Sequence, residues 1–341
     1  MTKVNKPSFG TLFTDHMFVM EWNEQQGWHN KRIQPYQNFI FDPASSNLHY
    51  GQEIFEGMKA FRTVDNKAVL FRPRNNLKRM NNSAGIMCMP SIDVEDTLSW
   101  LKKLIAKDKL LIPKDHGTSL YIRPTMIATE KSLNLKPSSN YLFFIVLSPV
   151  GALYEQGFNP VPILVSQHYT RASSGGVGQA KAAGNYGASM RAQKEAQTVG
   201  CVQVLWLDPL ERKYVEEVGA MNIFFVINNI LVTPLLTDSI LAGITRQSII
   251  ELCIQKNIPL QERRISIDEI IKGIQDGSVQ EILGCGTAAV VSPIGSLRYK
   301  DIVYIVNHNK TGTITQKVFT MLTDIQYGIN KGPADWLEDI D

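Results

Sequence analysis

A single lysine lies in a stretch of small residues. Lys181 is the one charged residue in SSGGVGQAKAAGNYGAS, residues 173–189. The stretch matches neither a P-loop, because Lys181 lies between two alanines, nor G-x-G-x-x-G, because Lys181 occupies the place of the third glycine. Small neighbours can desolvate an amine, which makes it a nucleophile able to form a Schiff base. The alternative is that the glycines only turn the chain and the lysine is solvated.

An aldehyde cofactor bound to this lysine would need further groups. Tyr186 follows five residues later, and its phenol would reach the same ligand if the loop folds back. In YVEEVG, strand alternation predicts that Glu216 and Glu217 point to opposite faces, one of them inward. A buried carboxylate needs a partner, such as a protonated pyridine nitrogen. The alternative is an edge strand on which both acids are solvated or salt-bridged.

A phosphate site is also available. Gly243, Ile244 and Thr245 begin a predicted helix, whose free N–H groups and dipole favour an anion. Thr287, in GCGTAA, could add a hydroxyl. Each residue also has a plain structural interpretation, since Gly243 could simply start a helix and Thr287 could fill a strand. Neither feature alone decides the function.

The first half of the chain predicts the elements of an α+β unit. Hydrophobic patterning indicates a helix that leads into a strand over 45–61. Farther along the chain, at 151–162, the pattern is interrupted by a segment rich in Gly and Pro. This Gly- and Pro-rich segment predicts a domain junction, with a small N-terminal domain at 1–151, a linker at 152–162 and a large C-terminal domain at 163–341. The other expected elements are strands at 17–22, 38–43, 68–73, 119–129 and 140–150, and helices at 75–87 and 94–109.

The second half predicts short strands that form a mostly antiparallel, barrel-like sheet. A capping box from Ser266 to Glu269 predicts a helix that runs to Gly273. An apolar strand at 281–294 is interrupted by Gly284 and Gly286. The other expected elements are strands at 163–173, 202–208, 214–219, 222–228 and 230–234, and helices at 188–200, 243–257 and 316–329.

Composition favours small-molecule chemistry. The 341 residues are 44% hydrophobic and 20% charged with a net charge of +3, and the charges are dispersed, so we expect no nucleic-acid or membrane partner. No long apolar run or signal-like start is present, which predicts a cytoplasmic protein. The cysteines are far apart, so we expect small buried hydrophobes and neither a metal site nor a disulfide.

Six motifs together resemble one enzyme family. HYGQEIFEGMKAF, LYIRP, GQAKAAGNYGAS, EEVGAMNIFFV, LAGITRQSIIEL and GCGTAAVVSPI occur along the chain. The chain resembles, from about residue 8 to residue 337, the branched-chain amino acid aminotransferases of the fold type IV pyridoxal phosphate enzymes. The resemblance implies an α+β fold like that of D-amino acid aminotransferase, in two domains, with pyridoxal 5′-phosphate as cofactor.

The resemblance also implies roles for the cofactor-binding residues. Lys181 would form the Schiff base with the cofactor and then act as the base that moves a proton from the substrate. Tyr186 would bind the cofactor's 3-oxygen and Glu217 its ring nitrogen. Arg79 would bind the phosphate, where the alternative is a salt-bridged arginine on a helix surface. The N–H groups of Ile244 and Thr245 and the hydroxyl of Thr287 would complete the phosphate site.

The substrate site implied by the resemblance combines polar and apolar groups. The α-carboxylate would meet the backbone around Thr287 and Ala288. An aliphatic side chain needs apolar walls, while the second carboxylate of glutamate needs a cation or hydroxyls. The remaining members are a polar corner of Tyr50, Tyr121 and Arg123, walls from Phe55 and Val150, and Leu133 and Leu135 reaching in from the partner subunit of a homodimer.

The implied activity is transfer of the amino group between leucine, isoleucine or valine and 2-oxoglutarate by a ping-pong mechanism. The alternatives are another fold type IV enzyme, such as a D-amino acid aminotransferase or aminodeoxychorismate lyase, or a catalytically silent scaffold. Some positions depart from relatives. Ala289 and Ser292 replace a C-x-x-C pair, which predicts no thiol switch, and Ala220 and Leu153 differ at positions that contact substrate.

Overall fold

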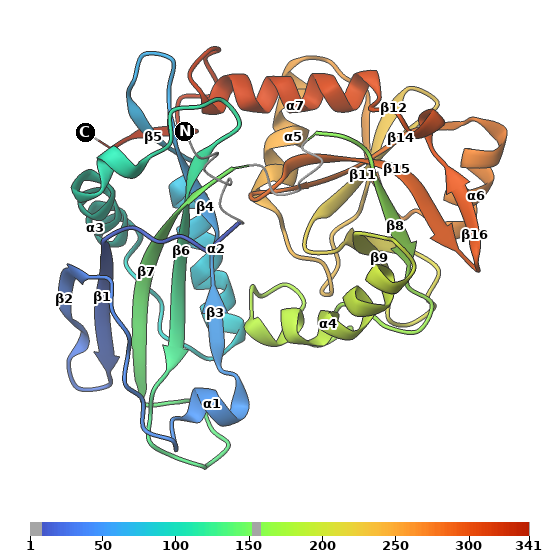
Figure 1. The fold of residues 1–341 in the computed structure, drawn as a ribbon. Coiled ribbons are helices and arrows are strands. Elements are labelled where there is room, and N and C mark those ends of the chain that lie inside the picture. Colours follow the sequence, from blue (N-terminus) through green and yellow to red (C-terminus); the bar gives the residue numbers. More distant parts are fainter. Residues whose placement is uncertain (1–8, 152–157, 341) are drawn as a thin grey trace, which may run out of the picture. The chain divides into compact units, whose positions relative to one another are not determined.

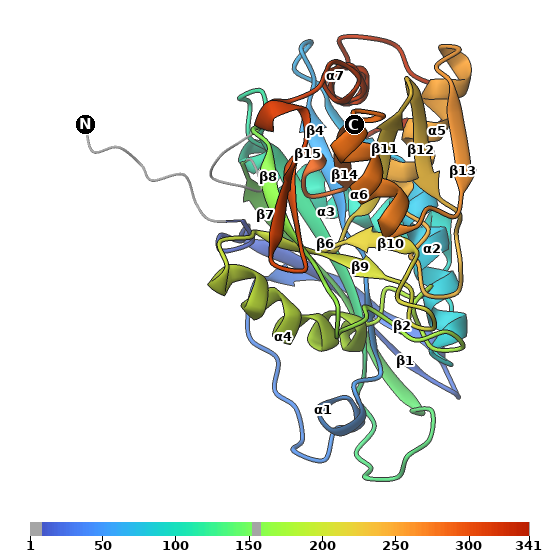
Figure 2. The ribbon, with the colours of Figure 1, turned by 90° about the vertical axis from the view of Figure 1, so that its right-hand side faces the viewer.

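The computed structural model describes residues 9–151 and 158–340, which form two compact units. The N-terminal unit comprises 9–151, 180–184 and 324–340, and the C-terminal unit comprises 158–179 and 185–323. Each unit is built on one sheet with helices packed against it (Figures 1 and 2). The predicted domain bounds follow chain order and stay a prediction. Within the predicted linker at 152–162, residues 152–157, Leu153 among them, lie outside the described part of the chain.

The N-terminal unit contains an eight-stranded antiparallel sheet in the order β17-β5-β4-β6-β7-β1-β2, with β3 paired to β6. Helices α2 and α3 pack against each other and contact β3 and β1 (Figure 1). The elements are β1 (His16–Asn23), β2 (Gly27–Pro35), α1 (Ser46–Tyr50), β3 (Glu53–Phe55), β4 (Met58–Arg62), β5 (Ala68–Phe71), α2 (Pro73–Ile86), α3 (Val94–Lys107), a 3-10 turn (Lys109–Leu111), β6 (Ser119–Ala128), β7 (Asn140–Val150) and β17 (Leu337–Asp339).

The strand predicted at 38–43 is wrong. These residues lie in an irregular segment, where Ile40 and Phe41 are exposed although their pattern is apolar. The prediction also missed β2, whose sequence GWHNKRIQP is polar because it is an edge strand with half-exposed side chains. An apolar run therefore predicts a strand only where a sheet is available to cover it.

The C-terminal unit contains a nine-stranded sheet in the order β10-β9-β8-β15-β14-β11-β12-β13, with β16 paired to β15. Most pairs are antiparallel, as predicted, and the parallel ones are β8 with β9 and β15, and β12 with β13. The elements that lie wholly or mostly in this unit are β8 (Val161–Val165), α4 (Ala183–Thr198), β9 (Gln203–Leu207), β10 (Val215–Val218), β11 (Asn222–Ile227), β12 (Ile230–Pro234), α5 (Ile244–Gln255), β13 (Leu260–Arg263), α6 (Ile267–Asp276), β14 (Val279–Gly286), β15 (Val290–Tyr299), β16 (Ile302–Ile305), a 3-10 turn (Asn307–Asn309) and α7 (Thr313–Gln326).

Local sequence signals account for several boundaries. The predicted capping box begins α6, because the Ser266 hydroxyl accepts a hydrogen bond from the N–H of Glu269 at 3.1 Å. The helix continues past the predicted end at Gly273 and stops at Gly277, whose φ is +82°. Among the described residues, no helix combines the length and apolar character needed to span a membrane.

The cysteines are all free, but they differ in burial. Cys201, Cys253 and Cys285 are buried, as predicted, and burial raises the pKa of each thiol. Cys88 is exposed instead, because it follows the end of α2 in a turn with φ of +52°. The expectation of a buried hydrophobe was therefore wrong for Cys88.

Candidate functional site

Lys181 is held in the N-terminal unit by its own backbone. Its N–H donates to the Ser83 hydroxyl at 2.9 Å, and its carbonyl accepts from the N–H of Phe55 at 3.1 Å. The next residue, Ala182, forms a bridge with Ile54, so the chain around Lys181 is fixed against β3. The side chain is half-buried, and Nζ lies 4.8 Å from the centre of the Phe55 ring. The amine therefore has a defined position beside an apolar wall.

Arg79 is a buried guanidinium on α2. It forms two hydrogen bonds with Glu56, from Nε at 2.7 Å and from one terminal nitrogen at 2.8 Å. Glu56 is fully buried, and its second oxygen also accepts from the Gly57 N–H. The ion pair fixes the plane of the guanidinium. Arg79 is therefore salt-bridged, as in the plain interpretation, but it is not on a helix surface.

Three of the predicted substrate residues come together on the N-terminal sheet. The Arg123 guanidinium carbon lies 4.5 Å from the Phe55 ring centre and 5.3 Å from that of Tyr121. Arg123 also donates to the Tyr121 hydroxyl at 2.9 Å. Phe55, Tyr121 and Arg123 share one face because β3 and β4 both pair with β6. The predicted polar corner thus has two of its three members in contact.

The other predicted substrate residues of this unit have different contacts. Tyr50 ends α1, and its hydroxyl donates to the Leu133 carbonyl. Leu133 and Leu135, in the loop between β6 and β7, are 62% and 83% exposed. Val150 is buried at the end of β7, opposite Ser119. Tyr50 and Leu133 therefore form a second group at the loop end of the sheet.

Tyr186 lies on a helix and not in a loop. Helix α4 begins at Ala183, five residues before the predicted start, so Tyr186 is in its first turn. The glycines at 184 and 187 had favoured a loop, but both have helical backbone. Tyr186 and Arg171 line a hollow of about 270 Å³ in the C-terminal unit, together with Trp206, Gly219 and Ala220.

Glu217 is a buried carboxylate on β10 of the C-terminal unit. It forms an ion pair with Arg171 and accepts hydrogen bonds from the Asn222 side chain at 3.1 Å and the Leu241 N–H at 3.1 Å. Arg171 itself donates to the carbonyls of Gly178 and Ser239. Because its partners come from separate segments of the chain, Glu217 has a fixed orientation.

Glu216 corrects the prediction that one of the two acids points outward. Glu216 and Glu217 are 4% and 2% exposed, respectively. The register of β10 against β9 shifts between Val215 and Val218, and this irregularity breaks the simple alternation. Glu216 accepts a hydrogen bond from the Ser239 hydroxyl, and burial, followed by the nearby Glu217, raises its pKa to about 7.

Glu216→Gln is expected to change how stability depends on pH. A carboxyl whose folded pKa is about 7, against 4.5 ordinarily, makes folding less favourable as pH rises from about 4.5 to about 7. The amide has no such titration, so the variant should be more stable than the wild type by about 2–3 kcal/mol at pH 8 and equal to it near pH 4.5. Urea unfolding at the two pH values measures this. Equal stability at pH 8 would contradict it, and the exposed Glu24→Gln is the control.

Asn222 connects Glu217 to the start of α5. Its side-chain nitrogen donates to both Glu217 and the Leu241 carbonyl. A Cβ on Gly243, the N-cap of α5, would lie 1.9 Å from the Asn222 side-chain oxygen, so only glycine fits there. No side chain caps α5 at Gly243, and the first helical residues are Ile244 and Thr245. The helix start thus presents N–H groups suited to a phosphate, as predicted.

Gly243→Ala is expected to destabilise the protein by about 1–3 kcal/mol, because the methyl group displaces Asn222, which is held by two hydrogen bonds. Thermal unfolding measures the loss. The matched control is Gly85→Ala in α2, where nothing lies within 4 Å of the added carbon. That change should be neutral or stabilise by up to about 1 kcal/mol. If both variants change the free energy of unfolding by the same amount, the close approach of Asn222 to Gly243 does not affect stability.

Thr287 and Ala288 occupy the turn between β14 and β15. The end of β14 pairs with β11, where Cys285 lies opposite Asn222. A Cβ on Gly286 would lie 3.3 Å from Met221, so this turn lies against the one that contains Ala220 and Met221. The strand is not broken at Gly284, contrary to the prediction, since β14 runs to Gly286. Through Asn222, the unit connects Glu217, the start of α5 and the Thr287 turn.

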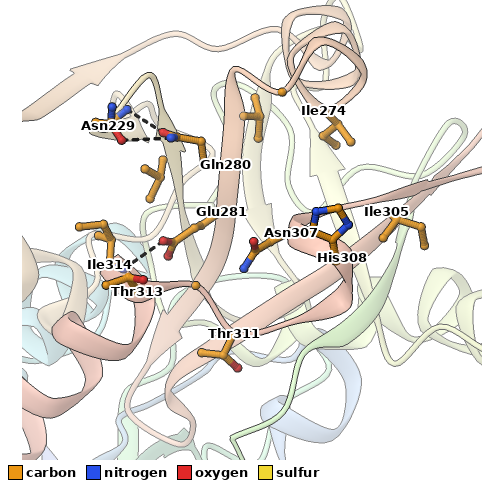
Figure 3. Close-up of a pocket in the computed structure, with 14 residues that line it drawn as sticks. Asn229, Ile274, Gln280, Glu281, Ile305, Asn307, His308, Thr311, Thr313 and Ile314 are labelled. Carbon is orange, nitrogen blue, oxygen red and sulfur yellow. Dashed lines mark hydrogen bonds between the residues drawn. The ribbon is translucent and has the colours of Figure 1, made fainter.

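A second hollow of the C-terminal unit has a different character. It measures about 730 Å³ and is lined by residues that include Asn229, Gln280, Glu281 and His308 (Figure 3). Glu281 accepts from the N–H groups of Ile314 and Thr315, so it caps α7. Asn229 and Gln280 hydrogen-bond to each other. Asn229, Gln280 and Glu281 therefore have structural partners, and none of the predicted site residues lines this hollow.

Comparison with known proteins identifies the family. The family model for class IV aminotransferases matches residues 53–297. Branched-chain-amino-acid transaminase 1 of Bacillus subtilis is 52% identical over 97% of this chain and 94% of its own, and branched-chain-amino-acid aminotransferase 2 of the same organism is 48% identical over 98% and 93%. The chain belongs to the class IV aminotransferases.

The solved structures agree with the fold. That of the Escherichia coli branched-chain amino acid aminotransferase matches with a TM-score of 0.81 and 25% identity, covering 96% of this chain and all of the other. The predicted resemblance and fold class are therefore confirmed. Since full-length relatives at about 50% identity carry the branched-chain name, the alternatives within the fold are not favoured.

Several residues of this aminotransferase have site contacts that sequence reasoning missed. Glu56 orients Arg79, Arg171 pairs with Glu217, and Ser83 holds the backbone of Lys181. Asn222 connects two of the predicted groups. No local pattern marks these residues, because each acts on a partner distant in sequence.

Proposed function

We propose that this protein transfers the amino group between leucine, isoleucine or valine and 2-oxoglutarate, with pyridoxal 5′-phosphate bound covalently to Lys181. The observation that carries the proposal is the setting of Lys181. Its amine is half-buried beside Phe55, and hydrogen bonds fix both its backbone N–H and its carbonyl. The family relationship supports the assignment of Schiff-base chemistry to this lysine.

The donor groups fit the three polar parts of the cofactor. A phosphate needs cationic and N–H donors, which Arg79, the first turn of α5 at Ile244 and Thr245, and the Thr287 hydroxyl supply. A protonated ring nitrogen needs a carboxylate, which Glu217 supplies. The phenol of Tyr186 would donate to the 3-oxygen. Glu56 and Arg171 would orient Arg79 and Glu217 respectively, and so belong to the same machinery.

When bound, the cofactor supplies an electron sink for the bonds at the substrate Cα. The protein's part is to position and to move protons. Lys181 Nζ would take the proton from Cα, and Glu217 would keep the proton on the ring nitrogen. Arg123 and Tyr121 would receive a distal carboxylate, and the α-carboxylate would meet the backbone at Thr287 and Ala288.

The substrate walls are proposed from the family resemblance, and the oligomer is proposed from exposed apolar side chains. Phe55 and Val150 would contact the aliphatic side chain. Leu133 and Leu135 are large exposed apolar residues, and we propose that they enter the partner's pocket in a homodimer. Tyr50 fixes the backbone of that loop through Leu133. Sedimentation velocity tests the dimer, and a monomeric active enzyme would contradict it.

We also propose a cytoplasmic location. The support is that the four cysteines are free thiols, which suits a reducing compartment. The partners would then be small-molecule substrates, namely branched-chain amino acids, their 2-oxo acids, glutamate and 2-oxoglutarate. Cell fractionation followed by immunoblotting tests the location, and recovery outside the cytoplasmic fraction would contradict it.

The experiment for the activity is a transfer assay on the purified holoenzyme. L-leucine with 2-oxoglutarate should give glutamate, and D-leucine should give none. Transfer from the D enantiomer only would contradict the proposal in favour of a D-amino acid aminotransferase. A protein that stays colourless with added cofactor would favour the silent scaffold.

A further inference from the structure

One face of helix α2 carries two residues of the candidate site. Arg79 and Ser83 lie four positions apart on α2, so they project from the same face, about 6 Å apart along the helix axis. Both residues are buried. Arg79 is the residue proposed to bind the phosphate, and the Ser83 hydroxyl accepts a hydrogen bond from the Lys181 N–H at 2.9 Å. One turn of α2 therefore carries both the proposed phosphate-binding cation and a support for the lysine backbone.

The end of β3 contacts both Lys181 and Arg79. The Phe55 N–H donates to the Lys181 carbonyl at 3.1 Å. The next residue, Glu56, is fully buried and accepts two hydrogen bonds from the Arg79 guanidinium, at 2.7 and 2.8 Å. Its own N–H donates to the Pro124 carbonyl of β6 at 2.8 Å, so this segment is anchored to the sheet. The hydrogen bond to the lysine and the ion pair with the arginine thus come from adjacent residues.

These contacts form a closed ring. The Lys181 N–H is bound to Ser83, and one turn of α2 joins Ser83 to Arg79. The ion pair joins Arg79 to Glu56, which follows Phe55 in the chain. The Phe55 N–H leads back to Lys181 through the lysine carbonyl. Because Ser83 and Glu56 are both 0% exposed, their hydrogen bonds are shielded from water. The position of the lysine backbone therefore depends on the pair of arginine and glutamate.

The reaction gives the ring a use. Misplacing a reacting group by about 1 Å can cost a factor of about 10² in rate, so the backbone of a Schiff-base lysine must be held firmly. A buried ion pair, by contrast, adds little to stability over apolar residues of similar volume. We propose that Ser83 and Glu56 are positioning residues for Lys181. Ser83 fixes the N–H of the lysine, and the pair of Glu56 with Arg79 fixes the strand end that holds its carbonyl. This inference rests on the proposed function.

The proposal links the phosphate side of the site to a reaction that needs no phosphate. Pyridoxal has the aldehyde of the cofactor but lacks its phosphate. In its reaction with Lys181, Nζ adds to the aldehyde carbon, and water leaves as the C=N bond forms. If Glu56 served only to orient Arg79 for the phosphate, replacing Glu56 would leave this reaction unchanged. If Glu56 also positions Lys181, replacing it should slow the reaction.

The experiment uses the full-length apoenzyme and two aldehydes, pyridoxal and pyridoxal 5′-phosphate. The absorbance of the Schiff base gives its rate of formation at saturating aldehyde, so that differences in affinity do not contribute. Borohydride reduction followed by mass spectrometry confirms that Lys181 has reacted. Calorimetry with inorganic phosphate measures the phosphate site separately.

Ser83→Ala should slow the reaction of both aldehydes about 10-fold, because the variant removes the acceptor of the Lys181 N–H. Its affinity for inorganic phosphate should equal that of the wild type, since Arg79 keeps its ion pair with Glu56. Phosphate binding weakened by the same factor would indicate a general loss of structure and would overturn the role of Ser83.

Glu56→Gln tests the ion pair. It should slow the reaction of pyridoxal at Lys181 about 5-fold or more, because an amide cannot form the paired charge contact with Arg79. The double variant Glu56→Gln with Arg79→Met keeps the net charge of the wild type and leaves no unpaired charge buried, so it decides the question if the single variant does not fold. The double variant should react with pyridoxal as slowly as the single one. A wild-type rate in the double variant would overturn the role of Glu56.

Two matched controls lie outside the ring. Ser99→Ala removes an exposed hydroxyl from α3, and Glu24→Gln changes an exposed acid in the turn between β1 and β2. Both should react with either aldehyde at the wild-type rate. If they slow the reaction as much as Ser83→Ala does, the effect is not specific to the ring and the proposal fails.

The outcomes distinguish this proposal from the proposed function. If the wild type forms no Schiff base at Lys181 with pyridoxal 5′-phosphate, the function itself fails. If the wild type forms it, but Ser83→Ala and the double variant react as fast as the wild type with both aldehydes, only the positioning roles are wrong.

Discussion

Lys181→Ala is expected to reduce amino transfer from leucine to 2-oxoglutarate by about 10⁴-fold or more, because in the proposed mechanism one side chain supplies both the nucleophile and the base. The structure supports a specific effect. The backbone of residue 181 is held by Ser83 and Phe55, and the substitution leaves these hydrogen bonds in place. The measurement is kcat/KM for the transfer, together with the visible absorbance of the bound cofactor.

The matched control is Lys194→Ala. Lys194 is exposed on α4, the helix that begins two residues after Lys181. It should leave both kcat/KM and absorbance unchanged. Activity within about tenfold of the wild type in Lys181→Ala would contradict the assignment of this lysine.

Glu217→Ala is expected to lower the free energy of unfolding by about 3–5 kcal/mol, because it leaves the buried Arg171 guanidinium without its carboxylate. The same change should lower kcat by about 10²-fold or more, since the variant lacks the carboxylate that we propose keeps the ring nitrogen protonated. Urea unfolding measures the first effect and steady-state kinetics measures the second.

The double variant Glu217→Ala with Arg171→Met separates the two effects. Removing the orphaned guanidinium should recover most of the lost stability, because no unpaired charge is left buried. Activity should stay low, since no carboxylate returns. Recovery of activity along with stability would show that Glu217 acts only through folding.

Local signals in the sequence were sufficient for many elements. The capping box at Ser266 placed the start of α6, and the long apolar run at 140–150 placed β7. The ordered motifs identified the family. Local sequence signals failed where the surrounding structure determines the backbone conformation. The glycines at 184 and 187 favour a loop in isolation, yet they lie in the first turns of α4.

The sequence predicted which residues belong to the candidate site, but it did not predict which residues contact one another. Lys181 and Glu217 were singled out from their local sequence and Arg79 from the resemblance, and their functional roles stay proposals. The pairs that orient them, Glu56 with Arg79 and Arg171 with Glu217, join residues far apart in sequence. The hydrophobic periodicity of the sequence gives no signal for such a pair. The shift in β10 that buries both Glu216 and Glu217 likewise depends on the register with β9.

The most direct test of the central claim is to locate the cofactor on the chain. The purified holoenzyme is reduced with borohydride, digested and examined by mass spectrometry. We predict that the phosphopyridoxyl group is found on Lys181, in the peptide that contains GQAKAAGNYGAS. An adduct on any other lysine, or none on a protein that still transfers the amino group of leucine, would contradict it.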